Sequence, residues 1–267
     1  MNIIMAADKG MLSGLETVIY STMLHNVCVD WYIFTMNINC VVCGEWRSFS
    51  AVDSEDLRWL ESIVKYHDSR SHIKVVDVSS LYAGYLENNP NRESGFTPFT
   101  TLRLLADLAL PEVGDALYLD CDVIVQKDLG DMYYSYLPKC EDYCAYSIPY
   151  ACDWEGEMVA GVLLLNLDKI RKNGFLSKAR DNINRNQYRF PDQMALRDAG
   201  KPYPLPETYN YMFSLYKLCY EPHIIHFTNE IEGKIYSDGK TLFYKKFPQF
   251  RYIEEGLDSV RRISNII

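Results

Sequence analysis

Residues 116–125, ALYLDCDVIV, decide the fold prediction, because two aspartates interrupt an apolar run that otherwise has the character of a buried strand. An unpaired buried carboxylate is costly, so Asp120 and Asp122 must be paired, hydrogen-bonded or bound to a metal. In a strand, residues i and i+2 point to the same side, so both carboxylates can face one point. Hard oxygens at the carboxyl end of a strand suit Mg²⁺ or Mn²⁺. The alternative is a pair of solvated carboxylates in a loop that follows the strand.

Strands and helices alternate along the chain before this stretch. Strands are predicted at residues 2–7, 30–38 and 72–78, and amphipathic helices at residues 13–26 and 51–67. Asp53 or Ser54 is a good cap for the second helix. Alternation of this kind predicts a mostly parallel sheet with helices on its faces.

The rest of the chain is less regular. Residues 84–98 are rich in Gly, Pro, Asn and charge, and are predicted to form a mobile or functional loop. Beyond it we expect a helix at 99–109, strands at 144–149 and 158–167, and helices to about residue 200. The tail from residue 201 shows no clear period. We therefore expect one domain over residues 1–267, with a less regular C-terminal extension at about 237–267.

Composition excludes several classes of protein. The chain is 48% hydrophobic with a net charge of −9, which suits a globular core and argues against nucleic-acid binding. No apolar run reaches the roughly 18 residues that span a bilayer, and the N-terminus lacks the cationic region of a secretory signal. The eight cysteines are expected to be reduced thiols of a cytoplasmic protein. A zinc site from Cys40, Cys43, Cys140 and Cys144 is disfavoured by its spacing.

Several segments in one order resemble glycosyltransferase family 8, the retaining enzymes that include glycogenin and bacterial lipopolysaccharide galactosyltransferases. They are MNIIMAADKG at the N-terminus, the segment FTTLRLLADLALPEVGDALYLDCD with its D-x-D, VAGVLLLNLDKI, FPDQMAL and IIHFTN. Each motif alone is unspecific, but their shared order across residues 1–236 is strong evidence. The resemblance implies a single Rossmann-like, nucleotide-sugar-binding α/β domain of the GT-A type, with a central mixed, mostly parallel sheet.

The resemblance also implies a reaction. A hexose, glucose or galactose, would move from a UDP-sugar to an acceptor hydroxyl with retention at the anomeric carbon. Mn²⁺ or Mg²⁺ held by Asp120, Asp122 and His226 would neutralise the diphosphate as a Lewis acid. The implied acceptor is a surface glycan or a lipid-linked sugar, which would bring a cytoplasmic enzyme to the inner face of the membrane. The donor sugar and the oligomeric state do not follow from the sequence.

The resemblance assigns roles to individual residues. Contacts with the nucleotide sugar are implied for Ala6, Ala7, Asp8, Arg103, Asp120, Cys121, Asn166 and Lys234. Asp192 would hold the sugar hydroxyls, and Gln193 would lie beside the anomeric carbon as the second catalytic residue. Each has a structural alternative: a turn aspartate for Asp8, an ion pair for Arg103, a helix start for Asp192 and a partly buried imidazole for His226.

The chain also departs from the family pattern. Val159 stands where the family has an asparagine, Lys9 and Gly10 follow Asp8, and the late histidine motif is altered so that Gly233 and Lys234 replace its Gly and Lys. Two rival functions stay open. A haloacid-dehalogenase-type phosphatase also uses D-x-D, but on its first strand, whereas three predicted strands come first here. A non-catalytic nucleotide-sugar-binding protein could share the fold.

Overall fold

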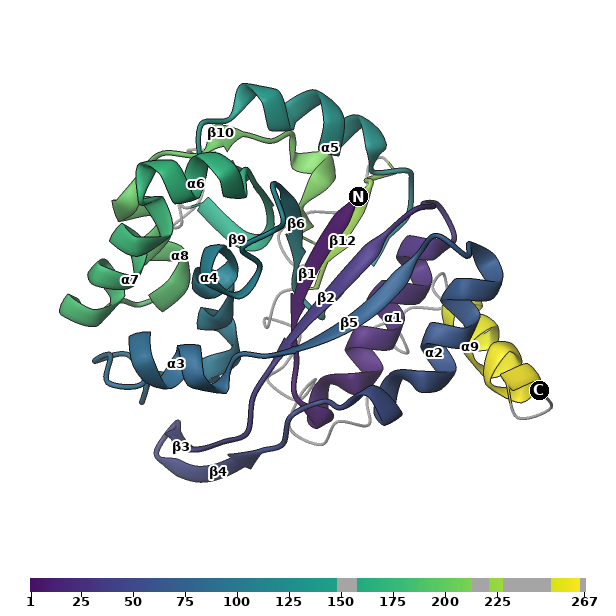
Figure 1. Ribbon diagram of the computed structural model, residues 1–267, viewed down its shortest axis with the longest axis horizontal. Helices are drawn as coiled ribbons and strands as arrows, with labels where there is room; N and C mark the ends of the chain where they lie inside the picture. The colour runs from purple at the N-terminus through teal and green to yellow at the C-terminus, as the bar shows by residue number, and fades with distance from the viewer. Residues whose placement is uncertain (148–157, 213–220, 228–250, 265–267) are drawn as a thin grey trace.

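The computed structural model describes residues 1–147, 158–212, 221–227 and 251–264, and its main feature there is a central seven-stranded sheet (Figure 1). The strand order is β10-β8-β9-β6-β1-β2-β5. The bounds are β1 Asn2–Ala6, β2 Asp30–Thr35, β5 His72–Asp77, β6 Ala116–Leu119, β8 Tyr143–Ser147, β9 Met158–Leu165 and β10 Tyr203–Pro204. Strand β9 runs antiparallel to β6 and β8, and the other neighbours pair in parallel. The predicted mixed, mostly parallel α/β sheet is confirmed.

Helices cover both faces of this sheet, because the strands alternate buried side chains between two cores. In β1, Ile3 and Met5 face one core, and Ile4 and Ala6 face the other. Helices α1 (Leu12–Met23), α2 (Ser54–His67), α5 (Gly130–Tyr136) and α9 (Arg251–Ser264) contribute to the first core. Helices α3 (Ser79–Tyr85), α4 (Ala106–Ala109), α6 (Leu167–Asn173), α7 (Phe175–Arg185) and α8 (Pro191–Ala199) contribute to the second.

Helix α2 shows how the local sequence determines an element. Asp53 caps it and forms a reciprocal capping box with Asp56, as the sequence predicted for its start. Leu57, Leu60 and Val64 form its buried side against the sheet. The spacing of these three residues is that of one helical face, so capping and burial specify the same helix.

A β-hairpin lies between β2 and α2 that the sequence prediction lacked. Strands β3 (Ile38–Val42) and β4 (Glu45–Phe49) pair antiparallel across Cys43 and Gly44. Both turn residues have positive φ, 52° and 79°, which is the backbone of the tight hairpin turns that follow the strand twist. The hairpin was missed because Cys43 is an unusual residue at a positive φ. The cysteines Cys40 and Cys43 therefore belong to a hairpin.

Two further segments differ from their predictions. The helix expected at 99–109 is a 3₁₀ helix, η2 (Pro98–Leu105), followed by the short α4. In the expected loop, Asn91 is buried, and its Nδ2 donates to the carbonyls of Ile183 and Asn186 at 3.0 and 2.8 Å. Its Oδ1 accepts from the backbone N–H of Tyr188. These bonds fix this part of the loop to the end of α7, which argues against the mobile alternative.

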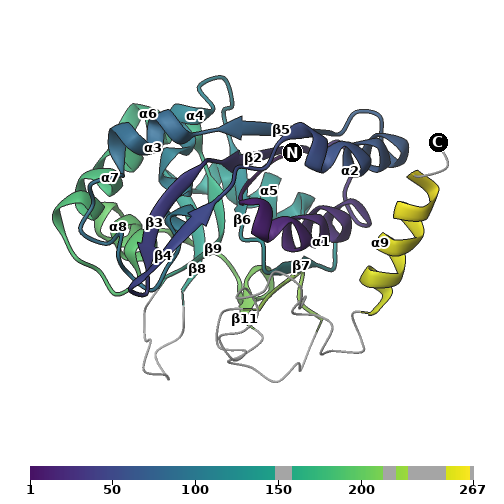
Figure 2. The same ribbon diagram turned by 90° about the horizontal axis from the view of Figure 1, so that it is seen from below.

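The expected less regular C-terminal extension contains a helix, α9. It lies beside α1 and α2 (Figures 1 and 2). Ile253 and Leu257 are buried and Val260 packs against the same core, so one helical face was present in the sequence but went unrecognised. Arg261 pairs with the buried Glu16 of α1. No helix in the described part of the chain is long and apolar enough to cross a membrane.

Candidate active site

The D-x-D stretch is not one continuous strand. Strand β6 ends at Leu119, and Val123–Val125 form β7 in a second sheet with β12 (Ile224–His226) and β11 (Tyr211–Met212). Asp120, Cys121 and Asp122 make the connection between the two sheets. The alternation of a single strand is therefore not the reason that the two carboxylates converge, which corrects the geometry inferred from the sequence.

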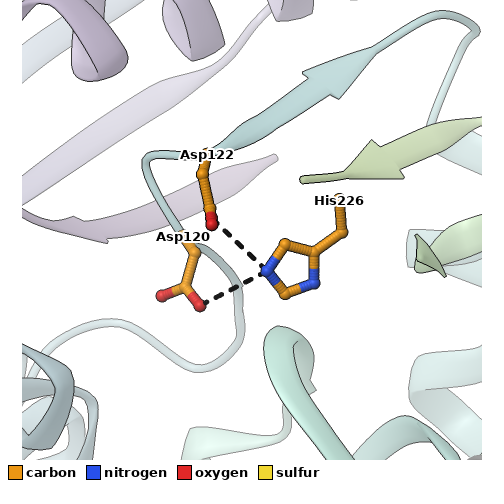
Figure 3. A group of neighbouring side chains, drawn as sticks. All are labelled: Asp120, Asp122 and His226. Carbon is orange, nitrogen blue, oxygen red and sulfur yellow. Dashed lines mark ion pairs between the residues drawn. The ribbon is translucent and has the colours of Figure 1, made fainter. Parts of the chain in front are cut away.

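The two carboxylates meet the imidazole of His226 at this junction (Figure 3). Strand β12 pairs antiparallel with β7 and sets His226 opposite Val123. The Nε2 atom of His226 then lies 3.3 Å from Oδ1 of Asp122 and 3.9 Å from Oδ2 of Asp120. One ligand atom from each residue falls within 4.8 Å of the others. The structure brings together the three residues that the sequence analysis named as metal ligands.

Backbone contacts hold this cluster in place. The N–H of Asp120 donates to the carbonyl of Gly161, and the N–H of Phe227 donates to the carbonyl of Asp122, each at 2.9 Å. A Cβ atom on Gly161 would lie 2.1 Å from Cε1 of His226, so the imidazole occupies the space of the missing side chain. The requirement for glycine here is one of close approach, and its signal in the sequence was the A-G-V of β9.

The donor set fits a hard divalent cation. Two carboxylates and one imidazole nitrogen are ligand types that Mn²⁺ and Mg²⁺ accept. Cys121 lies between the carboxylates in sequence, but its Sγ donates to the carbonyl of Ala6 at 3.4 Å and faces the core. Burial raises the pKa of that thiol well above its usual range, which keeps it protonated and unsuited to soft-metal ligation.

The electrostatics of His226 are those of an imidazole facing carboxylates. Its side chain is almost fully buried, and burial alone would lower its pKa. The charge of Asp122 and its hydrogen bond to the ring outweigh that effect, so the pKa of His226 is raised. The other ring nitrogen, Nδ1, lies 2.9 Å from Oδ1 of Asn210, a fully buried residue that sequence reasoning did not identify.

Arg103 is a buried cation that joins two acids of the site. Its Nη2 lies 2.8 Å from Oδ1 of Asp120, and its Nε lies 3.1 Å from Oδ2 of Asp192. The guanidinium also lies 4.2 Å from the ring centre of Tyr118, whose hydroxyl donates to Asp120. Burial would lower the pKa of Arg103, but Asp120, Tyr118 and Asp192 raise it. Of the two roles left open by the sequence, the structure shows the ion pair with aspartates.

Arg103 links Asp192, one of the two predicted catalytic residues, to Asp120. Asp192 is in the first turn of α8, directly after Pro191, and is buried. Burial raises its pKa, and the charge of Arg103 partly offsets that shift. Gln193 accepts a hydrogen bond at its Oε1 from the backbone N–H of Ala160, at 3.3 Å. The carbonyl oxygen of this side chain is thus already engaged by the protein.

An irregularity in β9 provides the backbone groups that organise the site. The pairing of β8 with β9 shifts register after Ala145, so that Tyr146 pairs with Val159. Backbone groups at this shift bind side chains: Val159 O accepts from Asn210, Ala160 O accepts from Arg103, and Ala160 N–H donates to Gln193. Bulges are common beside active sites because they re-aim backbone and side-chain groups.

Asp8 lies at the same edge of the sheet as Asp120. Strand β1 is parallel to β6 with Ile4 opposite Tyr118, so Ala6 and Ala7 lead the chain to that edge. Asp8 caps η1 (Lys9–Met11), and its Oδ1 accepts from the N–H of Met11 at 3.0 Å. Burial raises the pKa of its carboxyl group. Asp8 therefore shapes this turn.

Two predicted site residues are not brought to the cluster. Asn166 caps α6 through the N–H of Lys169, just beyond Leu165, which pairs with Ala116 at the start of β6. Asn166 therefore lies at the end of the strands opposite to the end that carries Asp120. Its side chain acts there as a helix cap. Lys234 lies outside the described residues. Among the described residues, Asp120, Asp122 and His226 form the one group of acidic, His and Cys side chains that could hold a metal.

Comparisons with known proteins place the chain in a family and identify structures with the same fold. The family model described as "Glycosyl transferase family 8" matches residues 2–232. Comparison with curated protein sequences finds no match.

Several solved structures share the fold. The galactosyltransferase LgtC in complex with donor and acceptor sugar analogues has 17% identity and a TM-score of 0.59, over 85% of this chain and 87% of that one. An active-site mutant of LgtC has 16% identity and a TM-score of 0.63, over 96% of both chains. The glycosyltransferase GlyE of Streptococcus pneumoniae TIGR4 has 19% identity and a TM-score of 0.61, over 84% of this chain and 53% of that longer one.

Proposed function

The chain belongs to glycosyltransferase family 8, and from that premise we propose that it transfers glucose or galactose from a UDP-sugar to an acceptor hydroxyl with retention. The observation that carries the proposal is the convergence of Asp120, Asp122 and His226 beside the group of Arg103, Asp192 and Gln193. The first set suits a divalent cation at a diphosphate. The second places a buried acid and an amide next to it, where a sugar would extend from that diphosphate.

Each group has a physical task in this reaction. Mn²⁺ or Mg²⁺, when bound, would neutralise the charge that grows on the departing UDP. Asp120, Asp122 and His226 would hold that cation, and Asp8 would bind the uracil or ribose at the neighbouring strand end. Arg103 pairs with Asp120 and with Asp192 and so fixes the direction of both carboxylates. Asp192 would accept hydrogen bonds from the sugar hydroxyls.

Gln193 supports attack on the same face as the leaving group. Its Oε1 already accepts from the N–H of Ala160, so its Nε2 is the side left to face the sugar. An amide so arranged is a poor nucleophile and a good positioning group. In the proposed step the acceptor oxygen bonds to the anomeric carbon as the bond to the UDP oxygen breaks. The acceptor's proton passes to the departing diphosphate.

The remaining parts of the proposal concern the acceptor, the diphosphate contacts and the cell compartment. The acceptor is a surface glycan or lipid-linked sugar by analogy, and contact with the inner face of the membrane would follow from it. Lys234 is the candidate for an additional diphosphate contact. The six cysteines in the described residues are free thiols, which is consistent with a cytoplasmic location. We treat residues 1–267 as one catalytic domain.

The test is a screen of UDP-hexoses with Mn²⁺ and without an acceptor, with UDP release as the readout. Release from UDP-glucose or UDP-galactose is expected. Binding of the nucleotide sugar with no UDP release would favour the non-catalytic alternative. Phosphate release from a phosphomonoester would favour a phosphatase. For the stereochemistry, NMR of the first-formed product should show the α configuration, and a β linkage from an α-linked donor would overturn the retaining mechanism.

A further inference from the structure

Asn210 contacts two parts of the site that the sequence does not connect. It follows η4 (Glu207–Tyr209) and precedes β11, which pairs in parallel with β12 so that Met212 lies opposite His226. The side chain of Asn210 is fully buried. Its Nδ2 lies 3.2 Å from the carbonyl oxygen of Val159, and its Oδ1 lies 2.9 Å from Nδ1 of His226.

These contacts leave one orientation for the amide. The carbonyl of Val159 can only accept, so the atom of Asn210 that faces it must be the NH₂ group. The atom that faces His226 must then be the amide oxygen, which can only accept. The ring nitrogen Nδ1 must therefore carry a proton. In a neutral imidazole the lone pair is then on Nε2, the nitrogen that faces Asp122 and Asp120.

We propose that Asn210 is a positioning residue that sets the tautomer of His226, so that Nε2 is ready to bind the divalent cation. The orientation originates in a backbone carbonyl of the β9 irregularity and reaches the site through two hydrogen bonds. Partners of this kind fix the ring orientation of metal-binding histidines and increase their basicity. The inference deepens the proposed function, since it rests on the metal role of His226.

The chain offers a matched control. Asn26 is also buried and makes the same two kinds of bond: its Nδ2 donates to Thr22 O at 3.0 Å, and its Oδ1 accepts from the N–H of Leu129 at 2.9 Å. Asn26→Leu and Asn210→Leu therefore remove equivalent hydrogen bonds from a buried amide. A loss of stability is expected in both variants, but a loss of metal affinity only in the second.

The first measurement is made on the wild-type protein without metal. Two-bond ¹H–¹⁵N NMR at alkaline pH, where the ring is neutral, should show His226 protonated at Nδ1, with its signals assigned by His226→Gln. A ring protonated at Nε2 would overturn the inference. This result does not depend on any UDP-sugar turnover, so it separates failure of the inference from failure of the proposed function.

The second measurement is Mn²⁺ affinity by calorimetry. Asn210→Leu should bind Mn²⁺ about 10- to 100-fold more weakly than the wild type. Asn210→Asp keeps an acceptor for Nδ1–H but loses the donor to Val159 O, so it should bind Mn²⁺ more tightly than Asn210→Leu, whereas Asn26→Leu should be unchanged. Wild-type affinity in a folded Asn210→Leu protein would overturn the proposal. Equal losses in Asn210→Leu and Asn210→Asp would also overturn it, because the amide would then act by packing rather than as an acceptor.

Discussion

The Nε2 atom of His226 lies 3.3 Å from Oδ1 of Asp122, across the antiparallel pairing of β12 with β7. These residues come from the middle and the late part of the chain, and they meet in a three-stranded sheet that is separate from the central one. The candidate metal site therefore depends on the junction where the chain leaves the central sheet after Leu119. Substitutions at and around that junction test this dependence.

Asp120→Asn and Asp122→Asn should both abolish metal-dependent activity, but they should differ in stability. Asp120 also pairs with the buried Arg103, so its replacement weakens a charged hydrogen bond in the interior. We expect urea unfolding to show a loss of about 1–3 kcal/mol for Asp120→Asn. The ion pairs of that arginine in the described part of the chain are with Asp120 and Asp192, so replacement of Asp122 should cost less. Equal stability losses would contradict the role of Arg103 as the partner of Asp120.

The pKa shift of His226 predicts opposite pH dependences for stability and metal binding. A raised pKa means that the folded, metal-free protein holds the proton more tightly than the unfolded chain, whose ordinary value is 6.5. That stabilisation is fully present below this value and is lost as pH rises through the folded-state pKa. Metal affinity should instead rise with pH, because the cation displaces the Nε2 proton.

Urea unfolding in excess chelator, between about pH 6 and about pH 9, measures the first effect. Wild-type stability should fall over that interval relative to His226→Gln. Parallel profiles for the two proteins would show that the pKa of His226 is the same in the folded and unfolded states.

The sequence predicted the sheet better than the connections around it. Strands β1, β2 and β9 were predictable because each is mostly a run of apolar residues, and α2 because it has both a cap and an apolar face. The hairpin β3–β4 was not, since its turn uses a cysteine at a positive φ where Asn or Asp is usual. The 3₁₀ conformation of η2 is a tertiary effect that helical periodicity does not report.

For the candidate site too, the sequence predicted the residues better than the reason that they converge. Asp120, Asp122 and His226 were found through their motifs, but the reason that they converge is the change of sheet after Leu119, which local alternation does not show. Asn210 had no motif, because its role comes from a contact with Val159 O, a backbone group. Asn166 was proposed by analogy alone, and its position after β9 is that of a helix cap.

Gly161→Ala should disrupt the metal site without touching a ligand. The new methyl group would lie 2.1 Å from Cε1 of His226, so the ring must move. We expect Mn²⁺ affinity to fall by at least about 10-fold, as for other changes that displace a ligand. Gly84→Ala is the control, because a Cβ there meets nothing within 4 Å. Unchanged Mn²⁺ affinity in a folded Gly161→Ala protein would mean that the site relaxes around the added group.

Gln193→Ala should slow turnover and leave UDP binding intact. The side chain of Gln193 accepts from the N–H of Ala160 and, among the described residues, is not hydrogen-bonded to Asp120, Asp122 or His226. The proposed contacts with the diphosphate should therefore remain. Steady-state kinetics should show a fall in kcat with little change in the affinity for UDP. A selective loss of UDP affinity, with kcat preserved, would place Gln193 at the nucleotide instead of the transferred sugar.

The central claim, that this chain cleaves UDP-sugars through a cation held at Asp120, Asp122 and His226, is tested most directly by UDP release with and without metal. Wild-type protein and folded Asp122→Asn would be given the best UDP-hexose in Mn²⁺, and then in excess chelator. We predict UDP release by the wild type in Mn²⁺ alone, and none from Asp122→Asn in either condition. Full release by the wild type in excess chelator, or by Asp122→Asn in Mn²⁺, would contradict the account.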